Sequence, residues 1–372
     1  MRVGPFRFNL QELAGSMGDF GTLLPLAIGY ITVCGMDPAG LLVMMGVANI
    51  ATGLIYRLPM PLEPMKVLAV MAIAGAWAPE KIYAAGIVMG LVWLLMGVTG
   101  AMEHVARWTP KTVVWGIQLS LGVLLSLKGL EMMTGWWLLG GVSVLIVLLL
   151  RENRYAPAAI VLMALGIVIM AFRGKLTGLA GVSLSLPPLV SVDFELLWPA
   201  FRDGGLAQIP LTATNAVIAT SALISKYWPE RNVTERQLSF NMGVMNLVTP
   251  FFGGMPMCHG AGGLAGQYYF GARTGGTNII EGTIEVCLGL FLAGSIATLF
   301  AAFPMAIVGA MMLMVGVELF KFAGELGLDG RLIPVAATVI GSVALNMAVG
   351  FAAGIILHYL VLGRPEVSND AS

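Results

Sequence analysis

Two short stretches carry the residue types best suited to chemistry. Residues 58–66 read LPMPLEPMK and set Glu63 and Lys66 among three prolines, while residues 255–263 read MPMCHGAGG and set His259 before three glycines. The prolines favour an extended lead into a helix, and the glycines leave bare amides at a second helix start. Because the N–H groups of a helix start and a lysine both attract negative charge, the two stretches predict an anion site.

Two acidic side chains make this prediction more specific. Glu63 would repel an anion unless it is protonated, so its position predicts coupling to protons. Asp19 lies deep in the first apolar segment, where a charge facing lipid is costly. It should therefore face a cavity or pair with a cation such as Lys66. Glu63 and Asp19 are the predicted proton-coupling residues.

Other polar residues leave two interpretations open. Thr214 and Asn215 either contact the substrate or form interhelical hydrogen bonds. His259 either donates to an oxyanion or caps the glycine-rich turn. Glu281 and Glu285, one helical turn apart, either relay protons or are structural partners of cytoplasmic arginines, and we prefer the structural interpretation.

The cysteines argue against several other site chemistries. Cys34, Cys258 and Cys287 lie in apolar stretches without CxxC spacing, so neither a disulfide framework nor a metal site is predicted, and no cofactor is expected. Cys258 and His259 are the one nucleophile and base in sequence proximity, and adjacent side chains rarely aim at each other. An enzyme is therefore not expected.

Composition sets the class of protein. Of 372 residues, 58% are hydrophobic and 11% are charged, and the mean hydropathy is +0.88. Soluble chains carry about 25% charged residues, so an all-α polytopic membrane protein in the lipid bilayer is predicted. The formal net charge is zero, so no basic surface suggests a nucleic-acid partner.

The chain is internally duplicated. Residues 45–52 read MGVANIAT and residues 242–249 read MGVMNLVT, and a Pro-Met pair follows each copy in the same register. At the same offset Gln11 aligns with Gln208. Duplicated halves of this kind are typical of secondary transporters.

The apolar runs predict fourteen membrane-spanning segments, seven in each half. The first seven are expected at 11–33, 38–56, 60–76, 81–100, 110–130, 136–150 and 156–172. The second seven are expected at 206–226, 236–253, 256–270, 277–294, 303–321, 332–346 and 349–362. Because seven is odd, similar halves must insert in opposite orientations, as a 7+7 inverted repeat.

This arrangement divides the chain into four parts. Residues 1–172 and 206–362 form the two repeats, 173–205 form an extracytoplasmic linker, and 363–372 form a short cytoplasmic tail. With the N-terminus in the cytoplasm, fourteen Arg and Lys residues lie inside and five outside. The positive-inside rule thus predicts a multi-pass protein of the cell membrane with both termini cytoplasmic.

Three stretches resemble the signature sequences of the molybdate transporter family, a branch related to the SulP sulfate permeases. They are GDFGTLLPL at 18–26, PMPLEPMK at 59–66 and PMCHGAGGLAGQYYFGARTG at 256–275. The resemblance implies molybdate uptake and the fourteen-segment fold shared by SulP and uracil permeases, without the C-terminal cytoplasmic STAS domain of typical sulfate permeases. One position departs from the family pattern, which has glutamine where this chain has Glu63.

Pattern and resemblance together predict where the substrate binds. In inverted halves, the broken third and tenth segments would meet head to head near the membrane midplane. The predicted substrate-binding residues are Asp19, Thr22, Glu63, Pro64, Met65, Lys66, Thr214, Asn215, Cys258, His259, Gly260, Ala261, Gly262 and Gly263.

The leading hypothesis is a proton-coupled secondary transporter for a tetrahedral oxyanion, with molybdate first and sulfate or tungstate next. A nucleobase carrier, in which Glu63 would accept N–H groups, and a passive anion channel are the alternatives. By analogy with the fold, a homodimer would form through the fifth, sixth, twelfth and thirteenth segments.

Overall fold

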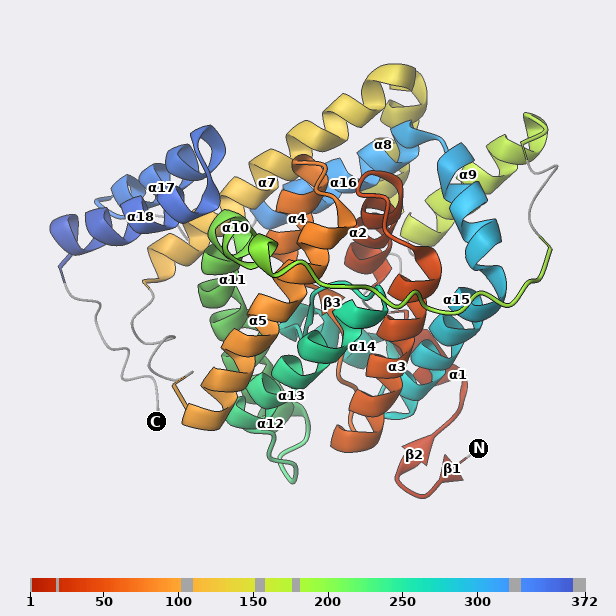
Figure 1. Ribbon diagram of the computed structural model, residues 1–372, viewed down its shortest axis with the longest axis horizontal. Helices are drawn as coiled ribbons and strands as arrows, with labels where there is room; N and C mark the ends of the chain where they lie inside the picture. Colours follow the sequence, from red (N-terminus) through yellow and green to blue (C-terminus); the bar gives the residue numbers. More distant parts are fainter. Residues whose placement is uncertain are drawn as a thin grey trace.

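The structure is a computed structural model that describes residues 2–17, 20–101, 110–150, 158–175, 181–320 and 329–363. It is mostly helical, and the helices pack into one body from which a small N-terminal hairpin projects (Figure 1). The hairpin pairs β1 (Arg2–Val3) with β2 (Phe6–Arg7).

The first half of the chain forms short and long helices in alternation. They are α1 (Leu10–Gly15), α2 (Phe20–Thr32), α3 (Pro38–Tyr56), α4 (Lys66–Ala74), α5 (Pro79–Thr99), α7 (Lys111–Met133), the 3₁₀ turn η1 (Thr134–Trp136), α8 (Trp137–Leu150) and α9 (Ala158–Phe172). Local sequence sets their ends: the Asp37 side chain accepts a hydrogen bond from Gly40 N at 2.7 Å at the start of α3. Gly100 ends α5 in the left-handed conformation at φ 70°.

The second half follows a similar plan. Its elements are η2 (Phe194–Leu196), α10 (Leu197–Ala200), η3 (Phe201–Gly205), α11 (Leu206–Leu211), η4 (Thr212–Ala219), α12 (Thr220–Tyr227), α13 (Glu235–Val248), η5 (Thr249–Phe252), α14 (Ala261–Phe270), α15 (Gly276–Ala302), α16 (Met305–Leu319), α17 (Leu332–Ala344) and α18 (Met347–Val361). Two further strands, β3 (Glu63–Pro64) and β4 (Met257–Cys258), lie at the centre of the body.

One helical run differs from the sequence expectation. The helix expected at 206–226 begins at Phe194 and continues to Tyr227, because Asp193 caps its first turn by accepting from Glu195 N at 2.9 Å. Within it, η3 and η4 are π-helical. Pro210 has no N–H to donate to the helical ladder, and π-helical turns of this kind often accompany functional sites.

Helices of the two halves pack against each other in pairs. The most intimate contacts join α3 to α15, α7 to α16, and α5 to α13. Glycines make these contacts possible: a β-carbon on Gly46 or Gly282 would strike the backbone of the other, and the same holds for Gly129 and Gly309. Close approach through small residues is typical of helices in membranes.

The linker crosses the surface in an extended conformation (Figure 1). Ser183 N donates to Phe291 O at 3.2 Å, Ser185 N to Leu290 O at 2.7 Å, and Val190 N to Phe251 O at 2.8 Å. These bonds fasten it across α15 and η5.

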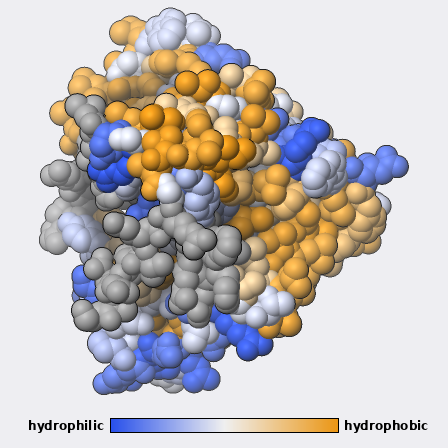
Figure 2. All heavy atoms as spheres, turned by 90° about the vertical axis from the view of Figure 1, so that its left-hand side faces the viewer, coloured by the Kyte–Doolittle hydropathy of each residue, from blue (hydrophilic) through white to orange (hydrophobic). Residues whose placement is uncertain are grey.

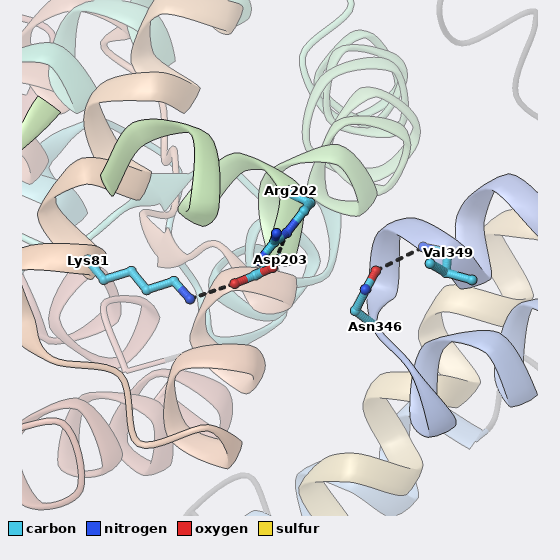
Figure 3. Close-up of polar contacts among 5 residues, drawn as sticks. All are labelled: Lys81, Arg202, Asp203, Asn346 and Val349. Carbon is cyan, nitrogen blue, oxygen red and sulfur yellow. Dashed lines mark hydrogen bonds and ion pairs between the residues drawn. The ribbon is translucent and has the colours of Figure 1, made fainter. Parts of the chain in front are cut away.

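Near the end of the linker, an ion pair ties it to the first half of the chain. Lys81 at the start of α5 contacts Asp203 of η3 at 2.6 Å, and Arg202 binds the other oxygen of Asp203 at 2.8 Å (Figure 3). Asn346, which faces the same region in this view, accepts from Val349 N at 3.0 Å and so caps α18.

The surface fits a lipid environment. Among the residues that the structure describes, five helices are long and apolar enough to cross a membrane, and shorter apolar helices accompany them. Large apolar side chains such as Leu138, Leu149 and Leu360 are about three-quarters exposed, and Figure 2 shows broad apolar areas with hydrophilic groups toward the margins. Apolar surface on this scale is foreign to soluble monomers, so the chain is a multi-pass membrane protein.

Candidate functional site

The two proline- and glycine-rich stretches cross at the centre of the molecule. β3 and β4 pair antiparallel, with Glu63 opposite Cys258 and Pro64 opposite Met257, and Met65 N donates to Pro256 O at 2.9 Å. Each strand leads directly into a short helix, α4 or α14. Because the strands are antiparallel, the helices leave in opposite directions and their N-termini face each other.

Two asparagines hold the crossing strands in place. Asn246 donates to Met257 O at 2.7 Å and accepts from Met257 N at 2.8 Å. Asn278 does the same for Met60, at 2.6 Å and 2.9 Å. Asn49, the counterpart of Asn246 in the repeat, accepts from Asn278 at 2.9 Å. Sequence reasoning missed this role, although the asparagine repeated in both octapeptides was the available signal.

The start of α4 is satisfied largely from within the protein. Gln208 accepts from Val67 N at 2.9 Å and Leu68 N at 3.4 Å, and its amide donates to Thr212 at 2.6 Å. Pro64 has no N–H, and the Met65 N–H is used in the strand crossing. Pro64, Met65 and Lys66 were expected to bind substrate in this stretch. Pro64 and Met65 therefore have no free backbone N–H to donate to it.

Glu63 occupies the space between the two helix starts. Its carboxylate is 3.2 Å from Lys66 Nζ, and its side chain is only 4% exposed against 23% for Lys66. The carboxylate also lies against the first turn of α14, since a β-carbon on Gly263 would come within 2.5 Å of Glu63 Oε1 and one on Gly260 within 3.0 Å of Oε2. The Glu63 carboxylate thus lies at the position where an anionic substrate was expected.

Gly262 differs from its neighbours in the same turn. A β-carbon added there would meet no atom of the described chain within 4 Å. Ala261, the first residue of α14, is partly exposed. The open face of α14 is therefore formed by residues 261 and 262, while Gly260 and Gly263 face Glu63.

His259 is fully buried behind this turn. Its Nδ1 lies 3.2 Å from Pro61 O and its Nε2 lies 3.1 Å from Asn241 Oδ1, and the ring packs edge-on against Tyr56 at 5.9 Å. Both ring nitrogens have partners in the protein, which favours the capping interpretation over donation to a substrate. Cys258 is buried and forms no disulfide.

The π-helical turn η4 contributes the second wall, where it meets α14. The Thr214 hydroxyl donates to Pro210 O at 2.9 Å and is thereby satisfied. Asn215 is half-buried, and its side chain makes no hydrogen bond with the part of the chain that the structure describes. Asn215 is therefore the better candidate of the two to meet a substrate.

The first segment of the chain, expected at 11–33, is described only in part. Asp19 lies outside the described residues, and Thr22 belongs to α2. Glu12 is buried and accepts from the Thr274 hydroxyl at 2.9 Å and from Arg273 N at 3.3 Å. Glu12 thus fixes the loop that starts α15.

Comparisons with known proteins agree with this architecture. The family described as "Molybdate transporter of MFS superfamily" matches residues 11–125 and 200–319. Molybdate transporter 1 of Arabidopsis thaliana is 32% identical over 96% of this chain and 90% of its own length.

Solved structures show the same fold at low identity. Murine Slc26a9, an anion transporter, aligns with a TM-score of 0.73 at 12% identity, covering 97% of this chain and 69% of that one. The transmembrane domain of the cyanobacterial bicarbonate transporter BicA aligns with a TM-score of 0.64 at 17% identity, covering 93% and 97%. The proteins similar to this chain are membrane transporters and not enzymes.

Proposed function

This chain belongs to the molybdate transporter family, and from that premise we propose that it is a secondary active transporter for a tetrahedral oxyanion, molybdate first. Sulfate and tungstate share this charge and geometry and are the next candidates. The observation that carries the proposal is the crossing of β3 and β4, which brings Lys66 and two helix N-termini to one buried point.

The substrate-binding residues of the proposal are those that border open space around this point. Lys66 would supply a full charge, Ala261 and Gly262 backbone donors, and Asn215 a neutral side chain. Asp19 and Thr22 would complete the site from the first segment, 11–33.

Proton coupling through Glu63 follows from charge balance. An oxyanion that approaches Lys66 meets the carboxylate that already neutralises it. Protonation of Glu63 removes that competing charge and leaves Lys66 and the start of α14 to the substrate. Inward movement of a dianion costs about 2.3 kcal/mol per charge per 100 mV of inside-negative potential, so at least two accompanying protons or other cations would be needed, and three for electrogenic uptake.

A binding titration and an uptake measurement test this function. Purified protein should bind molybdate more tightly than sulfate, and more tightly as the pH falls, because protons bind together with the substrate. In proteoliposomes, uptake should depend on a pH gradient and collapse with a protonophore. Uptake that depends on neither the pH gradient nor the protonophore would contradict proton coupling. The absence of counterflow would identify a passive channel.

Glu63→Gln separates binding from coupling. Glutamine keeps the shape of the side chain but cannot be charged, so exchange of molybdate should persist while accumulation driven by pH is lost. Binding above neutral pH should become tighter than in the wild type. A variant that still accumulates molybdate on a pH gradient would assign the proton to another group, with Asp19 the next candidate.

The membrane arrangement is proposed from the repeat and the charge distribution. Residues 1–172 and 206–362 would form inverted repeats of seven segments each, with 173–205 outside, the tail 363–372 inside, and the broken third and tenth segments meeting at β3 and β4. Two copies would pair through the exposed faces of helices such as α8. Reaction of single cysteines at Lys175 and Ser368 with an impermeant reagent, from opposite sides of the cell membrane, checks the orientation.

A further inference from the structure

Two buried carboxylates remain outside the proposed site. Glu281 is 1% exposed and Glu285 is 6% exposed, and they lie one turn apart on α15. At this spacing the β-carbons are about 5 to 6 Å apart, so two negative charges would repel each other in an environment with little water.

Neutral amides hold both carboxylates. Asn49 on α3 donates to Glu285 Oε2 at 2.9 Å, and Gln267 on α14 donates to Glu281 Oε2 at 3.5 Å. The Asn49 amide orients the Glu285 carboxyl group, but an amide does not neutralise a charge as an arginine would. The expectation of arginine partners is thus replaced, for Glu285, by an asparagine of the repeated octapeptide.

Gln267 points to a proton in this cluster. It is fully buried, and no donor among the described residues reaches its Oε1. The amide lies next to Glu281, and turning it over would place Oε1 where Nε2 is now, 3.5 Å from a carboxyl oxygen. A carboxylic acid O–H at Glu281 would then satisfy an acceptor that otherwise stays unpaired.

The cluster is connected to the substrate site through hydrogen bonds. Glu285 accepts from Asn49, Asn49 accepts from Asn278, and Asn278 holds both backbone groups of Met60. Met60 precedes β3, the strand that carries Glu63. In the second half Asn246 binds Met257 directly. In the first half, Asn49 contacts Met60 only through a second asparagine, Asn278. Because Asn49 does not bind the strand itself, its amide is available to Glu285, and this connects the Glu285 carboxylate to the hydrogen bonds that hold Met60.

Three charged residues from neighbouring elements contact the chain at or just before the first turn of α15. The Glu12 carboxylate of α1 accepts from the Thr274 hydroxyl, the backbone N–H of Arg7 in β2 donates to the same hydroxyl oxygen, and the backbone of Arg57 at the end of α3 lies against Gly275. From α2 the titratable side chain is Tyr30, and the linker residues bonded to α15 carry no titratable group.

We propose that Glu281 and Glu285 form a second proton site, linked to substrate binding through Asn49 and Asn278. The inference rests on the proposed function and deepens it, because a dianion needs at least two accompanying protons or other cations and Glu63 provides for one. The proton moves between solvent and a carboxylate oxygen, with no other bond made or broken.

Proton linkage measures the number of sites directly. The slope of log Kd for molybdate against pH, across roughly pH 6.5 to 8.5, counts protons taken up with the substrate and should be about two in the wild type. It should fall to about one in Glu63→Gln and in Glu285→Gln, and to about zero when both are changed. Glu131→Gln, at an exposed ion pair with Lys128, is the matched control and should keep the wild-type slope.

Two further measurements keep the test independent of variant folding. Protons absorbed when molybdate is added to the wild type in weak buffer should number about two per bound anion. The infrared band of a protonated carboxylic acid that appears when molybdate is added should be weaker in Glu281→Gln than in the wild type, because the amide of this variant imitates the protonated form.

The outcomes separate the two proposals. A wild-type slope of about one that Glu63→Gln abolishes would leave the transporter proposal intact and overturn the second proton site. Failure to bind any oxyanion would overturn the function itself.

Discussion

A carboxylate 3.2 Å from a partly buried lysine competes with any anion that approaches the same lysine. Glu63 is held there by the shape of the glycine-rich turn as much as by charge, since side chains at Gly260 or Gly263 would displace it. Selectivity at the residue scale therefore depends on how easily a bound oxyanion displaces the Glu63 carboxylate from Lys66.

Lys66→Ala tests the attractive side of this competition. Loss of a charged hydrogen-bond donor costs about 1.5 to 3 kcal/mol, so molybdate affinity should fall roughly tenfold to hundredfold. The measurement is a binding titration on monodisperse protein. Lys128→Ala, which removes a lysine of similar exposure from its pair with the exposed Glu131, should leave affinity unchanged, and equal losses in both variants would argue against a direct role for Lys66.

Two adjacent glycines allow a matched comparison. Gly263→Ala should lower thermal stability, because its methyl group would come within 2.5 Å of Glu63 Oε1. Gly262→Leu extends into open space and should leave stability nearly unchanged while abolishing oxyanion binding. Wild-type binding by a stable Gly262→Leu protein would place the substrate elsewhere.

At the element scale, strands of two residues are too short to persist without help from their surroundings. Asn246 and Asn278 supply that help by binding the backbone of Met257 and Met60 on both its donor and its acceptor. Gln208 plays a comparable part for α4. The broken segments are thus rigid because three buried amides replace the missing helical hydrogen bonds.

Asn246→Leu should reveal this dependence. The change leaves the buried backbone N–H and C=O of Met257 without hydrogen-bond partners, and each unsatisfied group costs about 1 to 3 kcal/mol. The thermal unfolding temperature should therefore fall clearly, and binding should weaken with it. Asn346→Ala at the α18 cap removes a more exposed bond and should cost about 1 kcal/mol without affecting binding. The comparison requires thermal unfolding and titration of both proteins.

The sequence was sufficient to predict where the short central helices begin. Prolines and glycines dictate where helices cannot continue, so the starts of α4 at Lys66 and α14 at Ala261 were expected closely. The partners of polar side chains could not be predicted, because a bond such as that from Asn278 to Met60 depends on packing between distant segments. His259 and Thr214 were left ambiguous for the same reason.

On the scale of the whole molecule, the two halves are interleaved and not merely adjacent. α3 lies with α15, α5 with α13, and α7 with α16, and the linker fastens across α15 from outside (Figure 1). Rearrangement during transport must therefore move sets of helices drawn from both halves.

The Lys81 and Asp203 pair tests one of these connections. Asp203→Asn breaks an ion pair whose side chains are about one-fifth exposed, so stability should fall by about 1 kcal/mol or less. Asp329→Asn, at the exposed pair with Arg331, should have no measurable effect. Thermal unfolding at low and high salt distinguishes the two, and a larger effect at Asp329 would contradict the assignment.

The shared sheet of β3 and β4 also has a consequence for biosynthesis. Glu63 and Pro64 leave the ribosome long before Met257 and Cys258, so the partner strand does not yet exist when the first half enters the bilayer. The first broken segment must wait, incompletely bonded, until translation has passed the second. A chain truncated between the halves should consequently be recognised as unfinished and degraded, however well its long helices insert.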